Sequence, residues 1–324
     1  MGTLYSIGEV LIDFIPLQKG KALKDVVSFE RAPGGAPANV AASVSKLGGS
    51  SAMLTKLGED AFGDFLLEKL AEAGVETKHI IRTSEANTAL AFVSLREDGE
   101  RDFSFYRKPC ADLLMTADEV DESLFSAGDI LHFCSVDLVE SPMKHAHLKA
   151  IESAKRNGAF VSFDPNVRLP LWDSEEACRE TILSFIPKAH LIKISDEELE
   201  FITGLSDEQA AIKSLFTGDV KAVIYTRGAD GAALYMNDRK MESAGFSVQV
   251  QDTTGAGDAF IGSFLFQMLE LETAPENSLS ILEQHGEEML QFANAAGAIT
   301  TTGKGAISSL PSIRQINEML TSPL

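Results

Sequence analysis

Late in the chain runs the segment Asp252-Thr253-Thr254-Gly255-Ala256-Gly257-Asp258-Ala259-Phe260. Alternating apolar residues over 246–251 predict a strand before it, and apolar residues at helical spacing over 260–269 predict a helix after it. Two glycines leave the backbone bare where this helix starts, so consecutive N–H groups can surround an anion. A lone Gly-x-Gly is typical of any helix start. Two threonines, two glycines and Asp258 together predict an anion hole with a built-in base.

Composition and charge limit the class of protein. The chain has 324 residues, 44% hydrophobic and 23% charged, which suits a globular protein of one large or two small α/β domains. Its formal net charge of −20 makes nucleic acids and anionic membranes unfavourable partners. Cys110, Cys134 and Cys178 form no CxxC pair. With neither a leader pattern nor an apolar run of membrane-spanning length, we expect a cytoplasmic protein.

Strand and helix patterns alternate through most of the chain, which predicts a mostly parallel sheet covered by helices on both faces. Two segments, about 12–33 and 87–111, break this rhythm, and Glu97-Asp98-Gly99-Glu100 in the second is typical of a hairpin. We therefore expect one domain over residues 1–324, with a small β lid built from these two segments. The predicted strands are Leu4–Ile15 and residues 52–57, 130–134, 160–163, 191–194 and 222–226.

Several common catalytic motifs do not occur in the sequence. It contains no GxxxxGK[ST] phosphate loop, no HExxH helix and no GxSxG turn. No GxGxxG follows the first predicted strand, which disfavours a dinucleotide-dependent oxidoreductase. Polar turns after successive predicted strands remain, and open α/β sheets bind their ligands at such turns.

The first polar turn is Gly34-Gly35-Ala36-Pro37-Ala38-Asn39. Its glycines permit a small ligand to approach, and the Asn39 amide offers a donor and an acceptor to a hydroxyl, although a flexible turn has the same composition. Asp13, at the expected end of the first strand, is either an acceptor for two hydroxyls or a solvated charge. Asp164-Pro165-Asn166 is a common turn, to which Arg168, and Arg107 from the lid, would add cations.

Three further segments are candidates, and the first of them has two interpretations. Ser195-Asp196-Glu197-Glu198 is either an acidic helix start or a place where Glu198 orders water around Mg²⁺. The segment 226–231 is a glycine-rich turn between two strands. Small residues at 294–298 would let a flat group pack against a helix.

Together these motifs resemble the PfkB (ribokinase-like) family of carbohydrate kinases, and within it the bacterial and plant fructokinases. Residues 34–39 resemble the N-terminal signature of the family, and residues 252–260 its C-terminal signature. Residues 8–13, 105–107 and 193–201 are similar to fructokinases in particular. The resemblance covers essentially the whole chain. It implies a ribokinase-like α/β fold, with a mostly parallel sheet and a small β-sheet lid.

The resemblance also implies roles for individual residues. Asp258 would be the base that takes a proton from fructose as ATP phosphorylates it to fructose 6-phosphate, and Gly255, Ala256 and Gly257 would form the anion hole. Sugar ligands would be Asp13, Gly34, Gly35, Asn39, Arg107 and Arg168, with Glu140 as a further candidate. Thr226, Gly228 and Asn294 would face ATP, and Glu198 would contact Mg²⁺ through water. Ligands of a monovalent cation, usually K⁺, would be Asp252, Thr254, Thr300, Gly305 and Ser309.

Alternatives remain open at this point. The protein could be another kinase of the PfkB family. Its phosphoryl acceptor would then be, in order of preference, 2-keto-3-deoxygluconate, ribose or a nucleoside. A non-catalytic sugar-binding protein is a third possibility, but such a protein has no need of Asp258. Ser195 stands where the wider family often has Asn, which leaves its role in Mg²⁺ or phosphate binding open. Unpaired lid strands imply a homodimer formed through the lid.

Overall fold

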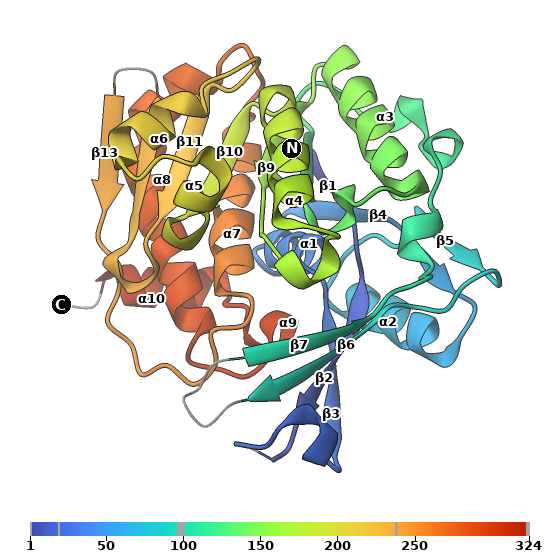
Figure 1. Cartoon of the computed structure of the whole chain (residues 1–324). Helices are drawn as coiled ribbons and strands as arrows, with labels where there is room; N and C mark the ends of the chain where they lie inside the picture. The colour runs from blue at the N-terminus through green and yellow to red at the C-terminus, as the bar shows by residue number, and fades with distance from the viewer. Residues whose placement is uncertain (1, 19, 96–100, 237–238, 322–324) are drawn as a thin grey trace.

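The structure, a computed structural model, describes residues 2–18, 20–95, 101–236 and 239–321. Its main sheet has the strand order β13-β12-β11-β10-β9-β8-β1-β4-β5 (Figure 1). Pairing is parallel from β5 to β11 and antiparallel for β12 and β13. The strands span Thr3–Ile7 (β1), Ser50–Gly58 (β4), Ile80–Thr83 (β5), Ile130–Cys134 (β8), Phe160–Asp164 (β9), Leu191–Ser195 (β10), Ala222–Thr226 (β11), Ala232–Met236 (β12) and Arg239–Ser243 (β13).

Helices cover both faces of this sheet, as predicted. One hydrophobic cluster joins one face to α3–α6, and a second joins the other face to α1, α7, α8 and α10. Neighbouring residues of β10 show the alternation, because Ile192 lies in the first cluster and Leu191 in the second. The helices span Ala36–Lys46 (α1), Ala61–Glu72 (α2), Pro142–Arg156 (α3), Glu175–Phe185 (α4), Asp196–Thr203 (α5), Glu208–Ser214 (α6), Ala256–Glu270 (α7), Ser278–Thr300 (α8), Ala306–Ser309 (α9) and Ile313–Thr321 (α10).

A second, smaller sheet projects from one end of the main sheet (Figure 1). Its strand order is β3-β2-β6-β7, with β2 and β6 parallel and the other pairs antiparallel. Phe14 stacks on Phe92 with ring centroids 4.7 Å apart, and Phe29 meets both rings edge-on. These aromatic contacts give the small sheet an apolar layer of its own. Its strands span Leu11–Pro16 (β2), Phe29–Gly34 (β3), Leu90–Leu95 (β6) and Arg101–Tyr106 (β7).

The predicted α/β fold is confirmed, but two predicted strands are wrong in detail. The apolar run Leu4–Ile15 is two strands in different sheets, because the chain turns at Gly8, whose φ is +144°. Asp13 therefore lies inside β2 and not at the end of the first strand. Residues 246–251 form no strand, and Gln251 donates its N–H to Thr301 O at 2.8 Å rather than to a sheet. The predicted hairpin turn at 97–100 lies outside the described residues.

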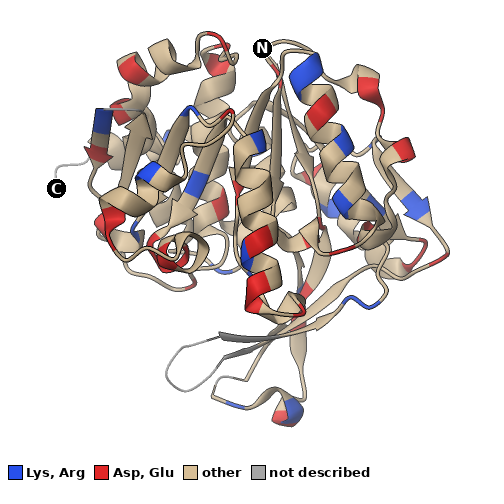
Figure 2. Ribbon diagram, turned by 45° about the horizontal axis from the view of Figure 1, so that its top comes forward, with Lys and Arg blue, Asp and Glu red and all other residues tan. Residues whose placement is uncertain are grey.

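Acidic and basic residues are scattered over the helices and strands in Figure 2. Many lie in exposed ion pairs, such as that of Lys69 with Glu72, which contribute little to stability. Over the described ranges, the structure contains no helix that is both long and apolar enough to cross a membrane.

Candidate active site

The start of α7 is the structural centre of the site. Gly255 caps this helix with φ +76°, and a Cβ there would lie 2.5 Å from Ala306 Cβ, so glycine is needed. Ala259 is the first residue whose N–H enters the helical pattern, donating to Gly255 O at 2.8 Å. The N–H groups of Gly257 and Asp258 belong to the unpaired first turn, which also carries the positive end of the helix dipole.

Asp258 is held by two amides from other parts of the chain. Asn39 Nδ2, in the first turn of α1, donates to Asp258 Oδ2 at 2.7 Å. Asn166 Nδ2, after β9, donates to Oδ1 at 3.3 Å. Helices α1 and α7 can approach closely because Gly262 faces Ser43, where a Cβ would lie only 2.5 Å from Ser43 Cβ. Asp258 is 7% exposed, and the two amides fix the orientation of its carboxylate.

Burial raises the pKa of Asp258, and four neighbouring groups oppose this shift. They are, in decreasing order of effect, the amide of Asn39, the charges of Arg168 and Lys193, and the amide of Asn166. The net pKa stays above its ordinary value. A carboxylate with a raised pKa is a stronger proton acceptor, which suits a general base.

The glycine turn leads into α1, the helix that carries Asn39. Gly34 ends β3, and Gly35 caps α1 with φ +106°; a Cβ at Gly35 would lie 2.4 Å from Glu9 O. Glu9 Oε1 also accepts the first N–H of α1 at 3.0 Å, which holds the turn in place. A Cβ at Gly34 would meet Asp13 Oδ2 at 2.1 Å, so the Asp13 carboxylate rests against the bare backbone. The predicted sugar residues Asp13, Gly34, Gly35 and Asn39 thus lie together.

The two predicted arginines have different surroundings. Arg168 is exposed, donates to Val167 O at 2.9 Å and lowers the pKa of Asp258 by its charge. Arg107 is 4% exposed and forms ion pairs with Asp112 and Asp137. Arg107 thus connects the end of β7 to the segment after β8.

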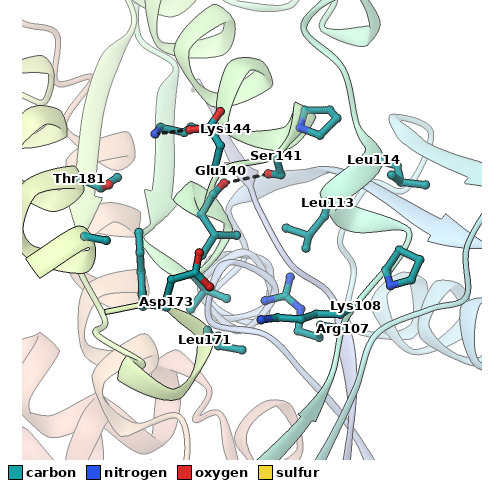
Figure 3. A pocket seen from close by; sticks show the side chains of 16 residues that line it. Arg107, Lys108, Leu113, Leu114, Glu140, Ser141, Lys144, Leu171, Asp173 and Thr181 are labelled. Atoms are coloured by element: carbon teal, nitrogen blue, oxygen red, sulfur yellow. Dashed lines mark hydrogen bonds and ion pairs between the residues drawn. The ribbon is translucent and has the colours of Figure 1, made fainter. Parts of the chain in front are cut away.

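Glu140 is largely solvent-exposed. Its side chain is 77% exposed and pairs with Lys144 at 2.9 Å. It lines a cavity of about 590 Å³, together with Arg107 and Trp172, between the segment after β7, the segment before α3 and the segment before α4 (Figure 3). Neither Asp258 nor Asn39 lines this cavity, so the base lies outside it.

The predicted ATP residues lie at and just after the end of β11 and within α8. Thr226 ends β11 beside Ser195 of β10, and its hydroxyl donates to Ile194 O at 3.5 Å. Gly228 follows with φ +51°, and a Cβ there would have open space around it. Asn294 is mostly buried, and its Nδ2 donates to Ser243 O at 3.1 Å and to Ala244 O at 3.2 Å. Asn294 therefore anchors the segment after β13.

Glu198 uses both carboxylate oxygens within the protein. Oε1 accepts Val167 N–H at 2.7 Å, and Oε2 accepts Ser195 N–H at 3.0 Å and Ser195 Oγ at 2.9 Å. Burial alone would raise the pKa of Glu198, but Lys193 and these donors hold it below its ordinary value. Ser195, where the wider family often has Asn, forms a capping box with Glu198. In the described part of the chain, no cluster of three or more His, Cys, Asp or Glu side chains is placed to hold a metal.

The predicted monovalent-cation residues lie on two adjoining segments. Asp252 Oδ1 accepts Thr254 N–H at 2.9 Å, and Oδ2 accepts Gly305 N–H at 3.0 Å, which ties the two segments together. Ser309 Oγ donates to Lys304 O at 3.0 Å. The last candidate, Thr300, is fully buried in the final turn of α8.

Three residues at the site were not among the predicted ligands. Asn166 has φ +45°, and the Asp-Pro-Asn turn was the signal for it. Lys193 and Asp164 form a buried ion pair of 3.1 Å between β10 and β9. The lysine inside the apolar run 191–194 could have indicated a buried ion pair, because buried lysines require a partner.

Comparisons with known proteins agree with this arrangement. The family described as pfkB family carbohydrate kinase matches residues 1–313. "Fructokinase-1" of Zea mays is 44% identical, over 97% of this chain and 96% of the relative. "Probable fructokinase-2" of Arabidopsis thaliana is 46% identical, over 96% and 93% respectively.

Solved structures of fructokinases are also similar to this chain. A fructokinase from Xylella fastidiosa with bound ATP has a TM-score of 0.90 and 36% identity, covering 98% of each chain. A fructokinase double mutant from Vibrio cholerae O395, with fructose, ADP and potassium ion bound, has a TM-score of 0.87 and 32% identity, covering 99% of this chain and 98% of that one. The chain therefore belongs to the PfkB family of carbohydrate kinases.

Proposed function

We infer that this protein is an ATP-dependent fructokinase, which converts D-fructose to fructose 6-phosphate. The observation that carries the chemistry is the buried Asp258 carboxylate, held by Asn39 and Asn166 at the positive end of α7. The choice of fructose rests on relatives named fructokinases, which are 42–46% identical over nearly the whole chain.

In the reaction, the sugar hydroxyl oxygen bonds to the γ-phosphorus of ATP while the bond from that phosphorus to the β,γ-bridging oxygen breaks. Asp258 accepts the hydroxyl proton, and ADP leaves. The N–H groups of Gly255, Ala256 and Gly257 would face the charge on the transferring group, although that of Ala256 also donates to Thr253 O at 3.3 Å in this structure. Such positioning and charge stabilisation account for most phosphoryl-transfer catalysis.

Asp13, Gly34, Gly35 and Asn39 would hold the sugar hydroxyls, with Arg168 beside them. The small sheet would act as a lid, closing over the sugar and excluding water from the reacting phosphoryl group. Asp13 lies in β2 of that sheet, so sugar binding and closure would be coupled.

ATP, Mg²⁺ and K⁺ are the proposed cofactors. Thr226 and Gly228 would face the nucleotide, with Asn294 holding the adjoining backbone. Both Glu198 oxygens already accept hydrogen bonds, which fits a contact to Mg²⁺ through water rather than a direct one. The segments joined by Asp252 offer backbone carbonyls, with Thr254, Thr300, Gly305 and Ser309, that fit a monovalent cation. When bound, these cations would supply positive charge near the phosphates.

We also propose a homodimer formed through the small sheet. Leu17 is 63% exposed, Val27 82% and Tyr106 62%, and all three lie in or beside that sheet. Unpaired strand edges and exposed apolar groups favour association with a second copy. A cytoplasmic location is also proposed, because all three cysteines are unpaired and buried.

The function is tested by a coupled assay of ADP release with ATP and Mg²⁺. The acceptors are fructose, 2-keto-3-deoxygluconate, ribose and adenosine, each with and without K⁺. We expect strong preference for fructose and faster turnover with K⁺. Preference for another acceptor would overturn the substrate assignment and keep the kinase chemistry. No turnover with any of them would support a non-catalytic sugar-binding protein.

A further inference from the structure

Lys193 lies in the interior of the protein on the α7 side of the main sheet. Strand alternation places it on the same face as Leu191, which packs with α7 residues, whereas Ile192 and Ile194 pack on the opposite face. The side chain is 6% exposed. Its Nζ lies 3.1 Å from Asp164 Oδ2 and 3.3 Å from Oδ1.

The Lys193 ammonium lies next to the anion hole. A Cβ built on Gly257 would lie 3.5 Å from Lys193 Nζ, with no other heavy atom within 4 Å apart from the adjoining residues and backbone of α7. Gly257 is the second residue of α7, so Nζ lies against the unpaired first turn. Its charge also lowers the pKa of Asp258.

This position is unfavourable for a lysine that has only a packing role. Burial penalises a cation, and the positive end of a helix repels one. Burial alone would lower the pKa of Lys193, but Asp164, Glu198 and Asp258 raise it above its ordinary value, so the side chain stays protonated at neutral pH. A lysine ammonium has three N–H donors. Within the described part of the chain, the hydrogen bond found for Lys193 Nζ is to Asp164.

We propose that Lys193 is a catalytic residue whose ammonium donates a hydrogen bond to the transferring γ-phosphoryl group. This proposal rests on the proposed function. Lys193 would keep its proton throughout, because the hydroxyl proton goes to Asp258. Its charge would stabilise the phosphoryl oxygens as the bond to ADP breaks and the bond to the sugar forms, together with the N–H groups of α7.

The competing explanation is that Lys193 only neutralises Asp164. Four variants separate the two: Lys193→Met, Asp164→Asn, the double variant carrying both changes, and Lys56→Met as a matched control. Lys56 is another mostly buried lysine, paired with Glu119 at 2.7 Å in a different region. The double variant removes both buried charges, so it tests catalysis without an unpaired carboxylate.

We expect kcat to fall about 10²–10³-fold in Lys193→Met and in the double variant, with KM for fructose changed little, since one lost donor typically has this effect. Lys193→Arg should recover part of the rate. Lys56→Met should stay within about tenfold of the parent kcat, and Asp164→Asn should lose less rate than Lys193→Met, because it keeps the ammonium. Binding of ADP, measured by calorimetry, should be the same in the parent and the double variant, because ADP lacks the γ-phosphoryl group.

Recovery of the parent kcat in the double variant would overturn the proposal and leave Lys193 as a charge partner. A loss of ADP affinity in the double variant as large as its loss of kcat would also overturn the proposal, because it would indicate general damage to the site. Failure of the fructokinase assignment is recognised separately, since the parent protein would then show no turnover of fructose. The variants are in that case compared on whichever acceptor the parent phosphorylates.

Discussion

Asn39 Nδ2 and Asp258 Oδ2 are 2.7 Å apart in space and 219 positions apart in the sequence. The contact joins the first turn of α1 to the first turn of α7, and therefore joins the sugar-binding turn to the base. Asn39 is in this way a positioning residue for Asp258 as well as a proposed sugar ligand.

Asp258→Asn should lower kcat by roughly 10²–10⁴-fold, because the amide cannot accept the hydroxyl proton. KM for fructose should change little, since the side chain keeps its size. Steady-state kinetics with fructose and ATP measure both values. Retained activity would remove Asp258 from the base role.

Gly257→Val should reduce kcat strongly while leaving the thermal midpoint nearly unchanged. The valine would block the approach of the phosphoryl group to the N–H groups, but its Cβ would make only an ordinary contact, 3.5 Å from Lys193 Nζ. Gly255→Ala is the contrasting variant, because φ +76° and the 2.5 Å clash with Ala306 should lower stability instead. An unchanged rate in Gly257→Val would mean that this turn does not hold the phosphoryl group.

Asn39→Ala should move the acidic limb of the pH profile of kcat/KM to higher pH. The Asn39 amide lowers the pKa of Asp258, so its loss raises that pKa, and the base then becomes protonated at a higher pH as the solution is acidified. Rates measured from pH 5 to pH 9 test the shift. An unmoved limb would mean that Asp258 does not control it.

Arg107→Met should destabilise the fold by about 3–5 kcal/mol, since it leaves two buried carboxylates without their cation. Burial already raises the pKa of Asp137 to about 7, although Arg107 opposes this effect. Urea unfolding measures the loss, and Arg314→Ala is the control, because Arg314 pairs with Glu318 on the surface. If Arg107→Met keeps its stability but loses affinity for fructose, Arg107 is a sugar ligand and not a structural tether.

Val27→Asp should dissociate the proposed dimer, because it puts a charge among the exposed apolar residues in and beside the small sheet. Light scattering coupled to size-exclusion chromatography reports the mass. Leu205→Asp, at a residue 41% exposed just after α5, should leave the mass unchanged. A monomeric parent protein would refute the dimer directly.

Local sequence patterns predicted most of the main sheet and the start of α7. The strands at Ile130–Cys134 and Ala222–Thr226 have the predicted bounds, since buried parallel strands are short apolar runs between helices. The run at 246–251 was misassigned because alternation of apolar residues cannot reveal whether a neighbouring strand is available. The division of Leu4–Ile15 between two sheets depends on a turn at Gly8 that packing against Pro37 requires.

By itself, the sequence determined the α/β class, the glycine turns and the identity of Asp258, because these depend on residue type and local spacing. Only the tertiary structure decided what surrounds that carboxylate. Asn166 reaches Asp258 by a left-handed backbone turn, and Lys193 reaches the anion hole from β10, on the face of the sheet that α7 covers. Arg107 lies in a buried ion-pair cluster, because Asp112 and Asp137 converge on it from separate segments. Contacts between distant segments depend on how strands are ordered and helices packed, and local spacing carries no information about that order.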